Sequence, residues 1–275
     1  MEKINTKKEK FTLRYYLRLL WTFIKMNIKS QMQYKKAFFM QVFGMILNDV
    51  AFLILWYLLF NNFKTSFAAK GIDFNNIVLI WAIGASSFGL MHAVFGGFRN
   101  LVNIIITGKL DNFLLYPANT LFLAGTSLSD ISAWGDLVYG YIIFILFLPL
   151  NFISILLFTY FIILASIFFA SVLILLSSIT FFIGNSEQLK ETIFNATISF
   201  ATYPEKFFTG PIKIMLFTFI PVGLGIYIPV RVITHFNITL FFISTISTVV
   251  LFVFSIFIFG IGLKKYESTS LMILS

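Results

Sequence analysis

The 275-residue sequence contains no cysteine, which excludes disulfide bonds, thiolate metal sites and cysteine nucleophiles. Charged side chains are also scarce, because Asp, Glu, Lys and Arg together make up only 11% of the residues. Proline occurs six times, and four of the six lie between residues 204 and 229. The breaks that proline imposes on a helix are therefore concentrated in one region of the chain.

The sequence also lacks the motifs of known catalytic and cofactor sites. It has no nucleophile elbow, no histidine-rich metal motif and no glycine-rich phosphate loop. The pair Gly108-Lys109 is followed by Leu110 rather than Ser or Thr, and it lacks the preceding glycine of a phosphate loop. We therefore expect no enzymatic activity and no cofactor in this chain itself. Any ATP would have to be bound by another chain.

Hydrophobic residues, in contrast, make up 59% of the chain, and the mean hydropathy is +0.93. A soluble domain of this size has too little interior to bury so much apolar surface, so the expected environment is lipid. The net charge of +9 does not indicate a nucleic-acid partner, because half of the twenty Lys and Arg residues lie before residue 37. Such clustering on one flank of a membrane protein indicates orientation and contact with lipid headgroups. The abundant Phe, Ile, Lys and Asn are typical of an AT-rich genome and suggest a bacterial plasma membrane.

Long apolar segments predict an all-α polytopic membrane protein with six transmembrane helices. A hydrocarbon core about 30 Å thick requires roughly 20 apolar residues per helix. The expected spans are 37–60, 77–98, 122–148, 152–183, a broken region within 191–237 that crosses once, and 238–263. A tight turn at 149–151 would join the third and fourth spans into a hairpin. The chain then divides into a basic N-terminal segment (1–36), a transmembrane domain (37–263) and a short tail (264–275).

The distribution of Lys and Arg predicts the orientation of the chain. With the N-terminus inside, fifteen of these residues lie on the inner side and five on the outer side. The five are Lys64, Lys70, Lys206, Lys213 and Arg231. Because cytoplasmic loops carry the excess of positive charge, we expect both termini and the segment 99–121 to be cytoplasmic.

The N-terminal stretch 10–36 is basic and amphipathic. At 100° per residue, six basic residues fall within an arc of about 100°. They are Lys10, Arg14, Arg18, Lys25, Lys29 and Lys36. We expect a helix that lies in the inner leaflet with this basic face toward anionic headgroups. A soluble basic tail is the alternative.

Four polar residues within the expected spans are candidates for the translocation path: Asn48, Asp49, Asp130 and Asp136. Asn48 and Asp49 lie near the middle of the first span, where ionisable groups are costly and often functional. For Asp49, burial between helices for assembly is the alternative to substrate or proton handling. Asp130 and Asp136 are six residues apart, so on one helix they would face different directions. We expect the polar stretch 127–136 to be locally unwound or to line a cavity.

Small residues recur at every fourth position of the second span: Ala85, Gly89, Ala93 and Gly97. Such a stripe allows another helix to approach closely. We therefore expect it to be a packing surface.

The region 204–237 is expected to be broken. It holds Pro204, Pro211, Pro221 and Pro229. Each proline would remove a backbone hydrogen bond from a continuous helix, at high cost in lipid. One interpretation is a kinked span at 212–231. The other is a short span at about 191–203, followed by a re-entrant helical hairpin on the outer side.

Several of these features together resemble the membrane subunits of type-2 ABC exporters. The resemblance rests on the basic amphipathic N-terminal helix, the six spans and the segment GKLDNFLLYP (108–117). That segment is similar to the family's Gly-x-Leu-Asp…Leu-Leu-x-Pro element through Gly108, Lys109, Leu110, Asp111, Leu114 and Pro117. The later YP, IP and IYIP stretches resemble the family's proline-marked outer region through Tyr203, Pro204, Pro221 and Pro229. This likeness favours the re-entrant interpretation.

The resemblance implies partners as well as a fold. The cytoplasmic segment 99–121 would hold a short coupling helix that docks into a groove of a cytoplasmic ABC ATPase, which would bind ATP and Mg. A second permease chain, identical or paralogous, would complete the translocation path. The residues agree with an interface, because an apolar and sparsely charged cytoplasmic segment is typical of a binding surface. A loop that lies on the lipid interface is the alternative.

The sequence thus predicts the permease subunit of an ATP-driven exporter, with a hydrophobic or amphipathic cargo such as a drug, a peptide or a lipid-like molecule. The alternative is an ion-gradient-driven transporter or channel that uses Asp49, Asp130 and Asp136 as ion sites. No clear inverted repeat with matched broken segments supports that alternative.

Overall fold

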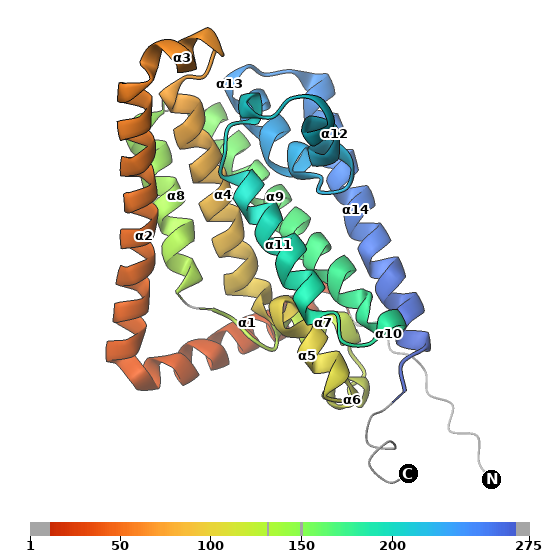
Figure 1. Cartoon of the computed structure of the whole chain (residues 1–275). Helices are drawn as coiled ribbons and strands as arrows, with labels where there is room; N and C mark the ends of the chain where they lie inside the picture. The colour runs from red at the N-terminus through yellow and green to blue at the C-terminus, as the bar shows by residue number, and fades with distance from the viewer. Residues whose placement is uncertain (1–11, 131, 149–150, 268–275) are drawn as a thin grey trace, which may run out of the picture.

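The computed structural model of the chain describes residues 12–130, 132–148 and 151–267. Within these ranges all regular secondary structure is helical, as the sequence predicts. The longer helices lie alongside one another in a bundle (Figure 1): α2 (Lys35–Asn62), α4 (Phe74–Phe95), α8 (Ala133–Phe147), α9 (Phe152–Ser178), α11 (Glu187–Ala201) and α14 (Ile238–Lys264). Lys10, most of the expected turn at 149–151 and the end of the tail lie outside the described residues.

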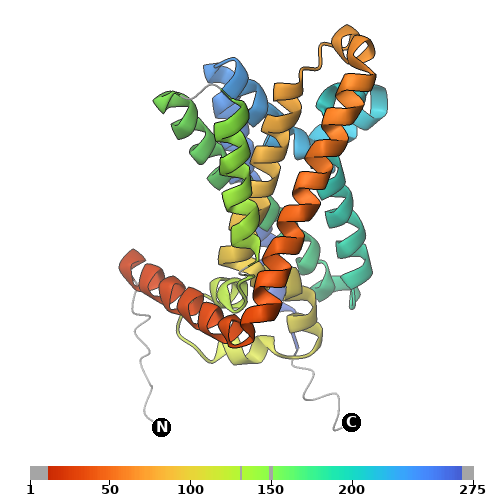
Figure 2. The ribbon, with the colours of Figure 1, turned by 90° about the vertical axis from the view of Figure 1, so that its left-hand side faces the viewer.

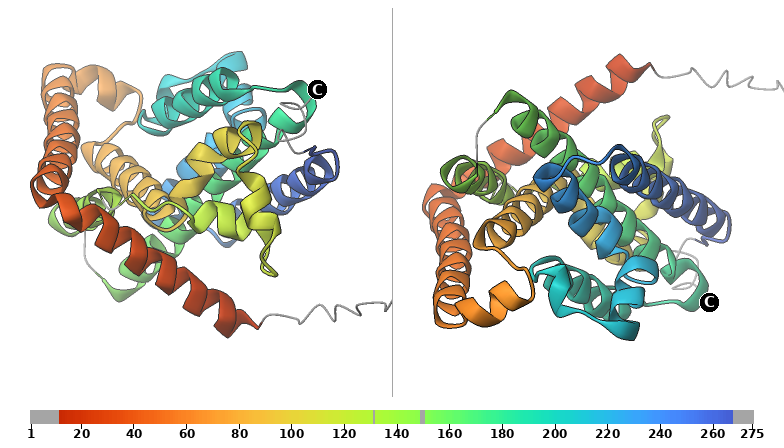
Figure 3. Two further views of the ribbon diagram at one scale, coloured as in Figure 1. Left: turned by 90° about the horizontal axis from the view of Figure 1, so that it is seen from below. Right: turned by 90° about the horizontal axis from the view of Figure 1, so that it is seen from above.

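Shorter helices cover the two ends of this bundle. The lower end in Figure 1 carries α1 (Leu13–Gln31), α5 (Leu101–Ile106), α6 (Leu110–Leu114), α7 (Thr120–Thr126) and α10 (Thr180–Ile183). The upper end carries α3 (Lys64–Ala69), α12 (Gly210–Thr218) and α13 (Ile228–Thr234). Seen from below, α1, α5 and α7 lie across the lower end of the bundle (Figure 3, left).

Four helical stretches are long and apolar enough to cross a bilayer: Leu13–Asn62, Phe74–Ile106, Phe152–Ile183 and Ile238–Lys265. They contain the first, second, fourth and sixth expected spans. The expected count of six is not confirmed, because α8 and α11 each have only 15 residues.

The third expected span, 122–148, is not one helix. Helix α7 ends at Thr126 and helix α8 begins only at Ala133, and the described residues between them are not helical. The Asp130 carboxylate accepts hydrogen bonds from the backbone nitrogen and the hydroxyl of Ser132, which closes a turn instead of a helical repeat.

The basic N-terminal stretch forms two helices rather than one. Helix α1 ends at a 3₁₀ turn, Met32–Tyr34, and α2 then continues from Lys35 in a different direction (Figure 2). The Tyr16 ring packs edge-on against Phe122 at 4.9 Å, and its hydroxyl accepts a hydrogen bond from the backbone nitrogen of Asn119. These contacts attach α1 to the lower end of the bundle.

The proline-rich region is sharply bent. Helix α12 and the segment Gly223–Thr234, which begins with the π-helix η4 (Gly223–Tyr227), meet at 80°. This bend agrees with both interpretations, a kinked span at 212–231 and a re-entrant hairpin. At the upper end Glu205 pairs with both Arg231 and Lys213, so the charges of this region are joined to one another.

The stripe of small residues on α4 faces α7 and α8. A Cβ atom at Gly89 would lie 2.5 Å from the Ala133 carbonyl oxygen and 2.7 Å from the Leu137 nitrogen. A Cβ atom at Gly97 would meet the carbonyl oxygen of Ala124. Because the colliding atoms belong to backbone, a side chain at either glycine would push whole helices apart.

We expect Gly89→Ala to destabilise the protein by about 1–3 kcal/mol, since a methyl group there must displace the backbone of α8. Gly260→Ala is the matched control, because a Cβ atom at Gly260 has no atom within 4 Å. Thermal denaturation in detergent, followed by size-exclusion chromatography, should show a lower midpoint for Gly89→Ala alone. Equal midpoints for the two variants would contradict the packing role of Gly89.

Candidate functional site

The four polar candidates from the spans line one cavity. It has a volume of about 630 Å³ and lies between α2, α4, α8 and α11. Asn48 and Asp49 come from α2, Asp136 from α8, and Asp130 from the unwound stretch before α8. The end of α11 also lines the cavity, through Ile198, Ser199, Ala201 and Thr202.

The placement of Asp130 and Asp136 corrects an expectation from their spacing. On one helix they would face different directions, but the helix is interrupted until Ala133, so both reach the same cavity. Asp136 is only 5% exposed. The sequence showed the polar stretch but not the direction in which the unwound residues would turn.

Asp49 is buried where α2 meets α8. The residue is 8% exposed, and its Oδ2 atom has no hydrogen-bond partner. The Tyr139 hydroxyl of α8 donates a 3.0 Å hydrogen bond to the backbone oxygen of Asp49, which fixes the two helices at this level. The Oδ2 atom of Asp49 is therefore available to a group in the cavity.

A second cavity, of about 740 Å³, adjoins the first on the side of the lower end. The two share Gln41 and Asp130 in their linings. The second cavity is also lined by His92, Arg99 and Glu191, so it carries charges of both signs. The two cavities are therefore neighbours, with Asp130 and Gln41 between them.

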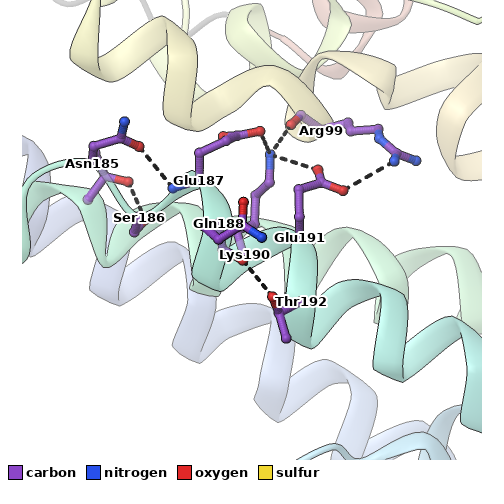
Figure 4. Close-up of polar contacts among 9 residues, drawn as sticks. Arg99, Asn185, Ser186, Glu187, Gln188, Lys190, Glu191 and Thr192 are labelled. Carbon is purple, nitrogen blue, oxygen red and sulfur yellow. Dashed lines mark hydrogen bonds and ion pairs between the residues drawn. The ribbon is translucent and has the colours of Figure 1, made fainter.

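A cluster of ion pairs lies beside the second cavity (Figure 4), because Arg99, Glu187 and Glu191 also line that cavity. The Lys190 side chain is completely buried and lies 2.8 Å from the Glu187 carboxylate and 3.4 Å from that of Glu191. It also donates to the backbone oxygen of Arg99, whose guanidinium pairs with Glu191 at 3.3 Å. The cluster therefore joins the start of α11 to the 3₁₀ turn η2 (Gly96–Asn100), which leads into α5.

Lys190 is one of the fifteen Lys and Arg residues expected on the inner side, and the sequence analysis did not predict this cluster. The spacing of Glu187, Lys190 and Glu191 on one helix face was visible in the sequence. Their partner Arg99 is about ninety residues away, so only the fold could show that the two segments meet.

The expected coupling segment consists of two short helices, α5 and α6, with Gly108 between them. Gly108 has a φ of 71°, a conformation that residues with side chains rarely adopt, which explains the glycine at this turn. Leu110 is completely buried within the chain, so the expectation that it enters a groove on another protein is wrong. The exposed apolar side chains are Leu114, Leu115 and Tyr116, at 45%, 84% and 64% exposure.

The segment also contacts the end of α14. Burial of the Tyr266 ring and the neighbouring Asp111 carboxylate raise the pKa of Tyr266 to about 12. The Tyr266 ring lies edge-on to Phe181 at 6.1 Å. Helix α6 is thus supported from the C-terminal side of the chain.

A model of the ABC-2 family, described as "ABC-2 family transporter protein", matches residues 46–270. The chain belongs to the ABC-2 transporter family. Comparison with curated proteins and with solved structures found no match. Membership makes this ABC-2 protein an integral membrane component of a transporter, and it implies ABC ATPases as partners in general.

Replacement of Lys190 by Met should destabilise the ABC-2 protein by about 2–4 kcal/mol, because the carboxylates of Glu187 and Glu191 would lose a buried cation. Lys64→Met is the matched control, since Lys64 is exposed at the opposite end of the bundle. Unfolding midpoints in detergent should fall for Lys190→Met and stay almost unchanged for Lys64→Met. If Lys190→Met unfolds at the midpoint of the unaltered protein, the cluster does not stabilise the lower end.

Proposed function

We propose that this chain is the permease subunit of an ATP-driven ABC exporter in a bacterial plasma membrane. Two permease chains, identical or paralogous, would form the translocation path, and two cytoplasmic ATPases would bind ATP and Mg. Family membership supports the proposal, as does the absence of a phosphate loop from this sequence. Both termini and the lower end would be cytoplasmic, since the lower end carries the larger share of Lys and Arg.

The observation that carries the proposal is the exposed apolar surface at the lower end. Leu114, Leu115 and Tyr116 project from a turn that Leu110 anchors in the core. Apolar side chains that gather on a supported turn are typical of a docking surface. We assign this surface to the ATPase, with Lys109 and Asp111 near its rim and Pro117 just beyond it.

The ion cluster offers a route from the ATPase to the cavity. A displacement of α5 and α6 would move η2, and the contacts of Arg99 with Lys190 and Glu191 would pass this movement to α11. Since the far end of α11 lines the cavity, closure of the ATPases could change the cavity wall. Charge-assisted contacts of this kind hold two segments in a defined register.

The proposed topology has six crossings. Helices α2, α4, α8, α9, α11 and α14 run alongside one another (Figure 1), and α8 and α11 would cross with the help of their flanking non-helical residues. Helix α11 ends at the upper end and α14 begins there, so the bent segment between them would form a re-entrant hairpin on the outer side. Non-helical backbone at that depth is tolerated where protein covers it.

The second permease chain would cover the exposed surface of α2. In the apolar window of Leu13–Asn62 only 11% of the residues are buried, against 72% for Phe74–Ile106. The cavity opens beside α2, so a second chain there would complete its wall. Aromatic lining residues such as Phe52, Trp81 and Phe169 suit a hydrophobic or amphipathic cargo.

Simultaneous replacement of Leu114 and Leu115 by Ala should weaken binding of the partner ABC ATPase by about 1–3 kcal/mol per residue. Ile214→Ala is the control, because Ile214 is 66% exposed at the upper end. Copurified ATPase and its stimulated ATP turnover should fall only in the double variant. Full ATPase binding by that variant would mean that the segment lies on lipid instead.

Neutralising the basic face of α1 should weaken its attachment to anionic membranes. Each Lys or Arg near such a surface contributes about 1 kcal/mol, so a 10–36 peptide with Arg14, Arg18, Lys25 and Lys29 changed to Gln should bind at least about tenfold more weakly. The exposed Leu17 and Trp21 of α1 remain in both peptides. Sedimentation with anionic and with neutral vesicles measures the difference, and equal binding of both peptides to anionic vesicles would contradict an interfacial helix.

A further inference from the structure

The cavity between α2, α4, α8 and α11 has an unbalanced charge. Asp49, Asp130 and Asp136 all line it, and the residues described there include no Lys, Arg or His. The three carboxylates lie close enough for Asp49 and Asp130 to act electrostatically on Asp136. One of them, Asp49, is more than nine-tenths buried and has an oxygen without a hydrogen-bond partner. Buried acidic groups of this kind need a compensating positive charge or a proton.

Among the described residues, the helical segments around the cavity supply no compensating positive charge. The sequence has no Lys or Arg in 37–63, 71–98, 110–189 or 191–205, which include all the helical residues around the cavity. Among the described residues no group of three or more His, Cys, Asp or Glu side chains could hold a metal ion. Protonation can neutralise a carboxylate here, whereas a positive group that balances an ionised one would have to come from a bound molecule.

The remaining lining fits the body of such a molecule. Phe52 of α2 stacks on Trp81 of α4 with ring centroids 5.0 Å apart, and Phe88 and Phe169 complete an aromatic wall. Aromatic faces attract cations as well as apolar groups. The volume of about 630 Å³ lies within the range typical of small-molecule sites.

We propose that this cavity binds lipophilic organic cations, with the positive charge held between Asp49 and Asp136 and the apolar body against Phe52 and Trp81. The proposal rests on the proposed function in one respect, namely that the bound cation is the cargo. Asp130 is held in its turn by Ser132 and lies at the mouth shared with the second cavity, where it attracts the cation toward Asp49.

The first test compares two probes of the same shape and opposite charge. Purified protein in detergent, without ATPase and without ATP, is titrated with tetraphenylphosphonium and with tetraphenylborate. Trp81 lines the cavity, so quenching of tryptophan fluorescence and equilibrium dialysis can both follow binding. We expect saturable binding of the phosphonium, at least about tenfold tighter than that of the borate. Equal binding of the two ions, or no binding of the phosphonium, overturns the proposal.

Isosteric variants locate the charge. Asp49→Asn and Asp136→Asn should each weaken phosphonium binding about tenfold or more and leave borate binding unreduced. Asp73→Asn is the matched control, because Asp73 is exposed at the upper end and lines a different cavity. Variants are compared only as monodisperse protein with an unchanged unfolding midpoint. Undiminished phosphonium binding in both cavity variants overturns the assignment to Asp49 and Asp136.

The outcome is separable from that of the proposed function. If phosphonium binds as expected but ATP drives no transport in vesicles that contain the ATPase, the cation site stands and the export function fails. If ATP-dependent transport is found and phosphonium is neither bound nor carried, the exporter stands and the cation site fails.

Discussion

The close contact of α4 with the segment before and within α8 is the interaction on which the other features depend. Gly89 lets the backbone of α8 approach α4, and below it the backbone nitrogen of Asp130 donates to the His92 carbonyl while Ser129 donates to that of Ala93. The unwound residues thus obtain their hydrogen bonds from α4 instead of from a continuous helix. This arrangement turns Asp130 and Asp136 toward Asp49 and creates the acidic cavity.

The pairing of charged side chains differs at three levels of the bundle. At the lower end Lys190 is balanced by Glu187 and Glu191, and at the upper end Glu205 is balanced by two cations. Between these levels Asp49 and Asp136 line a cavity whose described residues include no Lys or Arg. Paired buried charges stabilise a fold, whereas unpaired ones are costly. For this physical reason we assign the binding site to the cavity and not to the ion-paired ends.

The lower end combines a rigid inner layer with an exposed outer one. Leu110 is buried and Lys190 contacts three partners, whereas the Leu115 side chain is 84% exposed. A surface with such support can transmit a displacement, because packed segments move as units. In the proposed exporter the same layer would receive force from the ATPase and pass it along α11 to the cavity wall.

The sequence by itself determined the membrane environment, the helical class, the family and the residues at which helices break. These follow from local properties: apolar length, the position of Lys and Arg, and the proline and glycine content of 108–117 and 204–229. It also showed that the Ala85–Gly97 stripe could pack closely, because that pattern is visible on a single helix. The tertiary structure alone decided that the Leu110 side chain is buried and that Lys190 contacts Arg99. It also decided that Asp49, Asp130 and Asp136 line one cavity. Each of these depends on contacts between segments distant in sequence, and the direction of an unwound backbone is set by the neighbours that satisfy its hydrogen bonds.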